Sequence, residues 1–184
     1  MSKIALTPNA SGTGVFTISS PATNTNRTLT LPDEAGTVLT SASSITQNAG
    51  PAFSASANVT QSISGSTWTK VNFAYEVFDT NSNFSASRFT PTIAGYYQLN
   101  ASVYYASSPS GVAICVFHTN GNAAMEVGRT VAAGSGSFSG GHLSYANGST
   151  DYFEIYFYSV GANTLNDGTN TYLVGFSGSL VRAA

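Results

Sequence analysis

The sequence predicts an all-β fold, a sandwich or jelly roll of antiparallel strands, over residues 51–181 of the 184. Three observations indicate this class. Short runs alternate apolar and polar residues, as strands with one buried face do. No stretch has a convincing helical period. The composition combines 10 Tyr and 11 Phe with many Thr and Val, residue types that suit a pleated sheet.

The first 47 residues hold three short strand-like runs, at 14–18, 27–31 and 36–40, separated by turn-like stretches. Three such strands carry too few apolar residues to form a core of their own. We therefore expect their apolar side chains to be buried against partner chains or a larger assembly. The division is then an anchoring or trimerising segment at 1–47 and a knob domain at 48–184. The anchoring residues are Val15, Phe16, Ile18, Leu29, Leu31, Val38 and Leu39.

Five further strands are expected in the knob, and the run 96–105 is the clearest, since apolar and polar residues alternate through it. Asn-Gly pairs are strong signals for tight turns between antiparallel strands. Such pairs occur at Asn120-Gly121 and Asn147-Gly148, and 166–169 is a third turn candidate. The other expected strands are 68–73, 112–117, 151–158 and 172–181.

The runs 112–117 and 151–158 are apolar or aromatic on both faces, although the outer face of a sandwich is normally polar. The second face packs against a neighbouring subunit, or else loops cover it. Tyrosine is favoured at interfaces, which favours the first explanation. Glu154 on such a face would need a partner such as Arg88 or Arg129. The expected trimer interface consists of Cys115, Phe117, Tyr152, Glu154, Tyr156 and Tyr158.

Charge and composition exclude several classes of partner. The net charge is −2 with no basic patch, which argues against nucleic acid. A single cysteine excludes an intrachain disulfide framework, and no apolar run approaches the roughly 20 residues that cross a membrane. The N-terminus lacks the features of a signal peptide, so synthesis in a cytoplasm is expected. Only 8% of residues are charged, and surfaces this rich in Ser, Thr and Asn are common on virion proteins.

The sequence offers no catalytic constellation, and we expect no enzymatic activity. Neither His118 nor His142 belongs to a recognisable Ser-His-Asp arrangement. The Gly-rich stretch 134–140 is interpreted as a surface loop, and Cys115 as a buried structural thiol. One cysteine and two scattered histidines give no zinc spacing, and no carboxylate pair suggests glycoside hydrolysis.

No cofactor is expected, although structural calcium is an alternative. Asp79 with Asn81, or Asn166 with Asp167, could supply oxygen ligands. The loops 107–111, 134–141 and 161–170 are candidates for recognition, because exposed polar side chains there could hydrogen-bond a sugar. Their candidate ligand residues are Ser108, Ser110, Ser137, Asn163 and Asn166.

Residues Phe89–Val103, read FTPTIAGYYQLNASV, resemble the hallmark segment of the complement globular-head domain, a branch of the tumour-necrosis-factor-like jelly rolls. Residues 51–55, 151–155 and 176–180 resemble other strands of that family in the right order. The resemblance implies a ten-stranded jelly roll that forms a tight trimer around an aromatic core. It also implies ligand binding by outer loops without catalysis, with calcium near the trimer axis in some members.

Residues 12–40 resemble a different unit, a module of bacteriophage tail fibres and other phage structural proteins. Together the two resemblances imply a homotrimeric protein on a virion surface. The first reading is a fibre-type knob that attaches to other virion proteins and binds a glycan or protein on the host surface. The alternative is a capsid decoration (cement) or head-fibre protein. A glycan depolymerase is a third possibility that no residue pattern supports.

Overall fold

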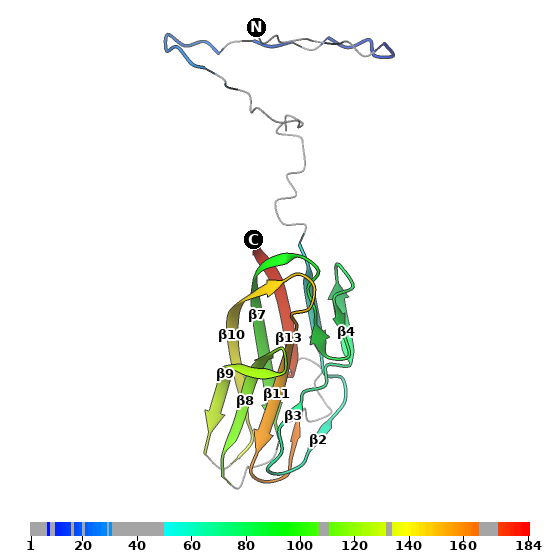
Figure 1. Cartoon of the computed structure of the whole chain (residues 1–184), viewed down its shortest axis with the longest axis vertical. Helices are drawn as coiled ribbons and strands as arrows, with labels where there is room; N and C mark the ends of the chain where they lie inside the picture. Colours follow the sequence, from blue (N-terminus) through cyan, green and yellow to red (C-terminus); the bar gives the residue numbers. More distant parts are fainter. Residues whose placement is uncertain are drawn as a thin grey trace. The chain divides into compact units, whose positions relative to one another are not determined.

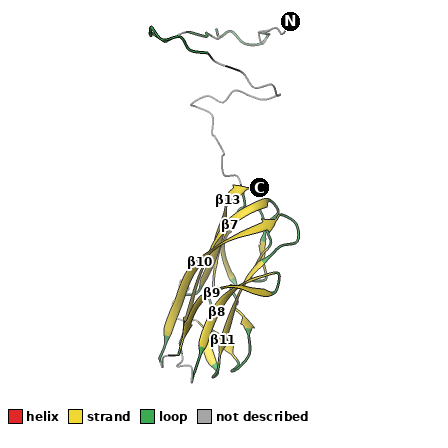
Figure 2. Cartoon of the chain, turned by 60° about the vertical axis from the view of Figure 1, so that its left-hand side comes forward, coloured by secondary structure: helices red, strands yellow, loops and turns green. Residues whose placement is uncertain are grey.

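The computed structural model describes residues 7, 10–15, 17–19, 21–28, 30, 50–106, 111–131, 134–165 and 173–184. The chain separates into two compact units, Met1–Ser44 and Ile45–Ala184. The second unit is built of strands and loops, and its described residues contain no helix (Figure 2). Accordingly, the described part has no helix that is long and apolar enough to cross a membrane.

Two sheets form the second unit (Figure 1). The first sheet has seven strands, and six of them follow the order β2 (Gln61–Ile63), β12 (Asn163–Leu165), β7 (Ala94–Tyr105), β13 (Gly175–Ala183), β1 (Ala52–Ser56) and β4 (Tyr75–Asp79). The seventh strand, β10, pairs with β7. Strand β10 covers Gly136–Asn147. In the second, of six strands, β3 (Thr69–Lys70) pairs with β11, and the main order is β5 (Phe84–Ser85), β6 (Arg88–Phe89), β11 (Phe153–Ser159), β8 (Ala113–Thr119) and β9 (Asn122–Thr130).

Strand β7 confirms the prediction for 96–105. Its burial alternates along the strand, with Tyr97, Leu99 and Val103 fully buried and Tyr96 and Asn100 exposed. An alternating run has one apolar face, and only one orientation places that face in the core. Burial raises the pKa of Tyr97 to about 12, and its hydroxyl donates a 2.7 Å hydrogen bond to the Ile93 carbonyl.

Aromatic rings from both sheets meet in the core. Phe53 of β1 stacks on Phe89 of β6, with ring centroids 4.3 Å apart, and on Phe84 of β5 at 4.9 Å. Its third partner is Phe176 of β13, met edge-on at 4.9 Å. Stacked and edge-to-face pairs of this kind add to the stabilisation from area burial. Phe53 therefore joins the two sheets at the centre of the domain.

Several strands were not predicted. The prediction of a loop at 134–140 is wrong from Gly136 onward, because β10 pairs there with β7 over twelve residues. Glycine and serine have low strand propensity, so β10 depends on its long partner rather than on its own pattern. The predicted strand at 68–73 shortens to Thr69–Lys70. The described strands also outnumber the ten that the family resemblance implied, since several are two or three residues long.

Asn120-Gly121 forms the predicted tight turn between the paired strands β8 and β9, whereas Asn147-Gly148 begins the connection from β10 to β11 of the other sheet. Asn120 and Gly121 have φ of 53° and 80°, and Gly148 has φ of 73°, the left-handed region that Asn and Gly tolerate best. A Cβ on Gly148 would lie 2.4 Å from the Ala94 nitrogen, so this position requires glycine. The third turn candidate, 166–169, lies outside the described residues.

The carboxylate of Asp151 joins the two turns. It accepts hydrogen bonds from Asn120 Nδ2 (2.8 Å) and from the Asn147 backbone N–H (2.9 Å). We expect Asp151→Ala to lower the free energy of unfolding by about 1–2 kcal/mol, because both donors lose a charged acceptor. Urea denaturation measures this. Asp151→Asn retains one acceptor oxygen, so its free energy of unfolding should fall between those of the unmodified protein and Asp151→Ala. Equal stability of all three proteins would contradict the prediction.

The first unit has no strand among its described residues, so the strands expected at 14–18 and 27–31 are not formed in the part that the structure describes. A strand needs a neighbour to satisfy its backbone groups, and none pairs with these residues in the described part of the single chain. Val15 is 91% exposed and Ile18 is 76% exposed. The expected anchoring residues Phe16, Leu29, Leu31, Val38 and Leu39 lie outside the described residues.

Candidate recognition surfaces

The predicted trimer interface has to be corrected at two residues. Cys115 and Phe117 are fully buried and belong to the core, where Cys115 lies opposite Phe157 and Phe117 opposite Ile155. Strand β8 is apolar on both faces, so its pattern cannot tell which face points inward. Burial raises the pKa of the Cys115 thiol far above its usual range, as expected for a thiol enclosed in the core.

The outward face of β11 carries Glu154, whose side chain is only 2% exposed although it is charged. Two cations compensate it. Arg88 Nε donates to Glu154 Oε1 at 2.9 Å, and Lys70 Nζ donates to the same oxygen at 3.2 Å. The partner predicted for Glu154 is therefore confirmed as Arg88, whereas Arg129 pairs with Glu126. Lys70, distant in sequence, was not predicted.

The network around Glu154 extends to rings on the same face. The Arg88 guanidinium lies 3.8 Å from the centre of the Tyr152 ring. His118 stacks on Tyr156 with centroids 4.1 Å apart. Burial raises the pKa of Tyr156, and the Glu154 charge adds to the shift. Burial lowers the pKa of His118, against a smaller opposing effect of its hydrogen bond to the Gly121 carbonyl. Tyr152, Glu154 and Tyr156 of the predicted trimer interface thus already have partners within one chain.

Replacing the buried carboxylate tests how far this network supports the fold. We expect Glu154→Gln to lower the free energy of unfolding by about 1–3 kcal/mol, because two adjacent cations lose their common counter-ion. Their side chains, 34% and 43% exposed, reach water and limit the loss. Glu126→Gln removes an exposed pair and should change the urea midpoint little. Equal midpoints for the two variants would contradict the expectation.

The outer face of the seven-stranded sheet exposes apolar side chains that the sequence analysis did not predict to lie on a surface. Tyr96 of β7 and Tyr145 of β10 pair edge-to-face at 5.6 Å while each remains nearly half exposed, and Leu143 beside them is 57% exposed. On the edge strand β4, Tyr75, Val77 and Phe78 are also about half exposed. Exposed apolar groups gathered on one face mark surfaces for protein contact.

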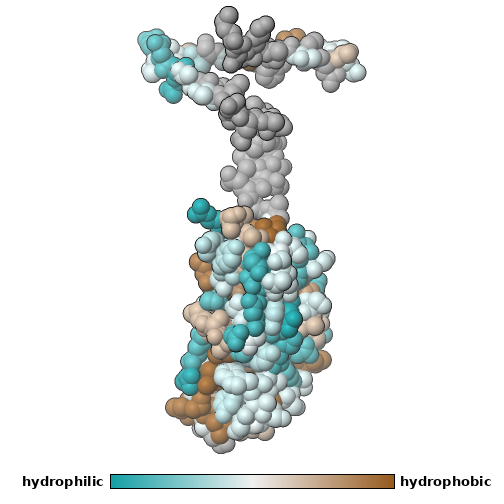
Figure 3. Space-filling view, in the orientation of Figure 1, coloured by the Kyte–Doolittle hydropathy of each residue, from teal (hydrophilic) through white to brown (hydrophobic). Residues whose placement is uncertain are grey.

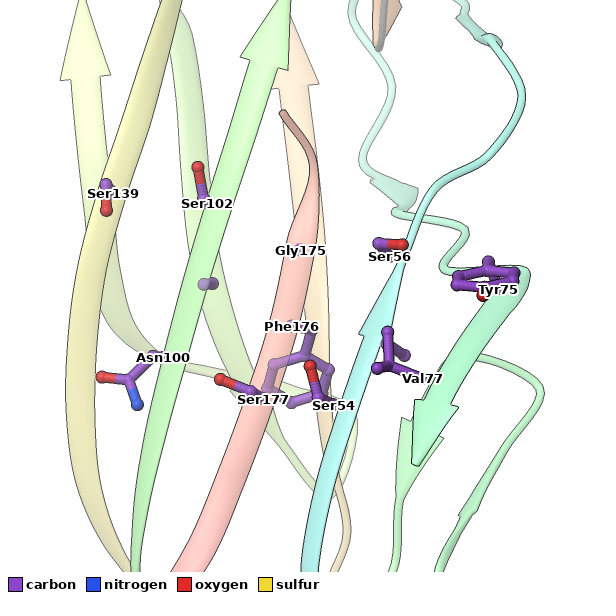
Figure 4. Close-up of a pocket in the computed structure, with 12 residues that line it drawn as sticks. Ser54, Ser56, Tyr75, Val77, Asn100, Ser102, Ser139, Gly175, Phe176 and Ser177 are labelled. Atoms are coloured by element: carbon purple, nitrogen blue, oxygen red, sulfur yellow. The ribbon is translucent and has the colours of Figure 1, made fainter. Parts of the chain in front are cut away.

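A shallow groove of about 420 Å³ lies on this face. Residues of β1, β4, β7, β10 and β13 line it. Figure 4 shows the small polar side chains of Ser54, Asn100 and Ser177 on their strands, with Tyr75 and Val77 of β4 at one end. The lining consists of hydroxyl, amide and apolar groups and includes no Asp, Glu, His or Cys side chain, so it can hydrogen-bond and pack against a partner.

The structure places two of the predicted ligand-loop residues in strands. Ser137 lies within strand β10, and Asn163 lies within β12 and is 5% exposed, so neither is a loop residue. Strand pairing with β7 and β2 holds these segments in the sheet. Ser108, Ser110 and Asn166 lie outside the described residues.

The Asp79 carboxylate, a calcium candidate, serves the backbone instead. Its oxygens accept hydrogen bonds from the Phe84 N–H at 2.6 Å and the Asn81 N–H at 3.2 Å. Among the described residues, no three His, Cys, Asp or Glu side chains gather as a metal site would require. Asn166 and Asp167, the other candidates, lie outside the described residues.

The prediction from sequence missed Trp68, the single tryptophan of the chain, as a surface residue. It is 44% exposed and borders a groove of about 280 Å³ on the outer face of the six-stranded sheet. On the face of the knob in Figure 3, small apolar patches interrupt a largely hydrophilic surface. A lone tryptophan is a signal in itself, because its large ring is rarely left half exposed without a partner.

No protein-family model and no curated protein sequence matches the chain. Solved structures do match. The globular domain of zebrafish complement 1qA protein aligns with a TM-score of 0.54 at 17% identity, over 73% of this chain and 99% of that one. Eiger TNF from S. frugiperda aligns at 0.54 and 10% identity, over 73% and 93%. The PRD1 vertex protein P5 aligns at 0.51 and 14% identity, over 72% and 98%.

Each alignment covers between 93% and 99% of the neighbour and 72% or 73% of this chain. The expected jelly roll of the complement 1q and tumour-necrosis-factor type is therefore confirmed as the fold of the head. The neighbours' names point to structural or ligand proteins rather than to enzymes. The described part of the second unit therefore has a jelly-roll fold similar to that of the complement 1q and tumour-necrosis-factor domains.

Proposed function

We propose that this protein is a non-enzymatic virion surface protein of a bacteriophage, in which a self-associating jelly-roll knob binds a receptor or glycan on the host surface. The observation that carries the proposal is the outer face of the seven-stranded sheet. Its half-exposed Tyr96, Leu143 and Tyr145 form a surface that a single copy leaves uncovered. A head of this kind acts through contacts at its surface.

Self-association through this face would give a homotrimer, the state implied by the complement-type resemblance. The interface then differs from the one predicted, since Glu154 and its neighbours belong to the other sheet. Three linked heads would bind a repetitive surface far more tightly than one, because the second and third contacts are intramolecular. Weak individual sites would suffice for attachment.

The first unit supplies the anchor in this proposal. Val15 and Ile18 are almost fully exposed in the single chain, although both are aliphatic. The resemblance of residues 12–40 to a phage structural module supports burial of these side chains against other virion proteins. Synthesis in the host cytoplasm followed by assembly onto the virion surface fits the composition described above.

Two measurements on the full chain test the proposal. Fluorescently labelled protein should bind host cells saturably and compete with intact virions for adsorption. Antibodies against the knob should label virions in electron micrographs. Cells that bind no protein, with virions that adsorb normally in its presence, would contradict the receptor-binding role.

The second candidate is a capsid decoration or head-fibre protein. The observation that favours it is the likeness of the fold to a vertex protein, the PRD1 protein P5. Antibody label confined to the capsid, together with heat-labile virions when the protein is lacking, would support this candidate. Label confined to the tail would remove it.

A further inference from the structure

The groove beside Trp68 combines a flat aromatic wall with a polar rim. Its floor includes the outward side chains of β8, Ile114 and Val116, which are almost fully buried. Met125, 44% exposed, borders it on β9. Glu126 and Arg129 complete the lining. The groove holds about 280 Å³, space for a small group rather than for a protein segment.

Neighbouring rings hold the Trp68 indole in place. Its ring lies 5.2 Å from that of Tyr158 and 6.3 Å from that of His118. His118 is itself fixed by stacking on Tyr156 and by a 3.1 Å hydrogen bond between Nδ1 and the Gly121 carbonyl. A ring that is already ordered loses little entropy when a ligand packs on it, which favours binding.

The polar rim is a bidentate ion pair. Arg129 Nη2 donates to Glu126 Oε2 at 2.7 Å, and Nε lies 3.2 Å from both carboxylate oxygens. The two side chains are 52% and 41% exposed, so they can also bond a ligand. Together they offer donors and acceptors with no net charge, which matches a neutral polar ligand better than an anion.

We infer that this groove is a subsite for one pyranose ring of a neutral surface polysaccharide. The C–H face of the sugar would pack on Trp68, while its hydroxyls bond Glu126 and Arg129. This inference rests on the proposed host-binding function and names its ligand class. The neutral rim and the net charge of −2 make a nucleotide or polyanion a poor occupant.

The single tryptophan makes the site directly measurable. The full-length protein is titrated at pH 8 with the methyl glycosides of glucose, mannose, galactose and N-acetylglucosamine, with intrinsic fluorescence excited at 295 nm. His118 is neutral there, since burial lowers its pKa, so its charge does not alter the emission. We expect at least one glycoside to change the emission saturably, with Kd on the order of millimolar, as for one small ligand in a shallow site.

Variants locate the bound sugar. Glu126→Ala with Arg129→Ala keeps the fluorophore, removes the hydrogen-bonding groups of the rim and should weaken binding at least fivefold. Arg182→Ala, at an exposed arginine on β13 of the other sheet, is the matched control and should leave the Kd unchanged. Trp68→Ala, followed by saturation-transfer NMR, should abolish binding.

Three results would overturn the inference. They are no saturable change with any glycoside, an unchanged Kd in the double variant, or a Trp68→Ala protein that binds no sugar but has also changed its oligomeric mass. The last would assign the groove to contact between copies. Host-cell binding separates this inference from the proposed function: a Trp68→Ala protein that still binds cells as the wild type does removes only the subsite. Failure of the wild-type protein to bind cells removes the proposed host-binding function.

Discussion

Replacing Leu143 and Tyr145 together by aspartate is expected to reduce the full-length protein to a monomer of 19.0 kDa. Both residues lie on β10, on the outer face of the seven-stranded sheet, and are 57% and 47% exposed in one chain. The monomer tolerates the charges because they remain in water. An interface would have to bury two carboxylates without partners, at a cost of several kcal/mol each.

Light scattering coupled to size-exclusion chromatography measures this change. The unmodified protein should elute with three times the mass of the chain, and the double variant with the mass of one chain. Val131→Asp is the control, since Val131 directly follows β9 of the other sheet and is 74% exposed, and this variant should keep the larger mass. A double variant with unchanged mass would show that the seven-stranded sheet does not carry the self-association.

Shortening Phe53 to alanine should give the largest loss of stability. The side chain is 1% exposed and contacts three other phenylalanine rings across the two sheets. Loss of a large buried ring removes its transfer free energy and leaves a cavity, about 3–5 kcal/mol in all. The rings around it come from paired strands and cannot collapse freely into the space.

Urea denaturation at one protein concentration measures the effect, with a lower midpoint and an unchanged slope expected. Phe78→Ala provides a control of the same residue type. Phe78 lies on β4, opposite Ser54 of β1, and is 49% exposed, so its removal should shift the midpoint little. Similar shifts in both variants would mean that Phe53 does not hold the centre of the core.

The sequence alone predicted the elements whose local pattern agrees with their place in the fold. Strand β7 alternates strictly, and the two Asn-Gly turns supply the left-handed residues that tight turns need. The resemblance of the segment around β7 to complement-type domains led to the correct jelly roll. The need of Glu154 for a cation also followed, because a buried carboxylate requires one, but only the structure chose Arg88 over Arg129.

Other features depended on contacts between distant residues. Strand β10 is rich in Gly and Ser and forms because β7 offers a complete ladder of partners. Lys70 reaches Glu154 only because β3 pairs with β11. No local sequence pattern predicts the pairing of β10 with β7 or the contact of Lys70 with Glu154.

The opposite faces of β8 show most clearly what the hydrophobic pattern of a sequence cannot decide. Cys115 and Phe117 point into the core, whereas Ile114 and Val116 point outward beneath the Trp68 groove. Both sets are apolar, so hydrophobicity marks the strand but cannot orient it. The sequence by itself therefore determined an all-β jelly-roll head but not its surface. The tertiary structure alone decided which apolar residues form that surface, because burial depends on the partner sheet and not on the residue.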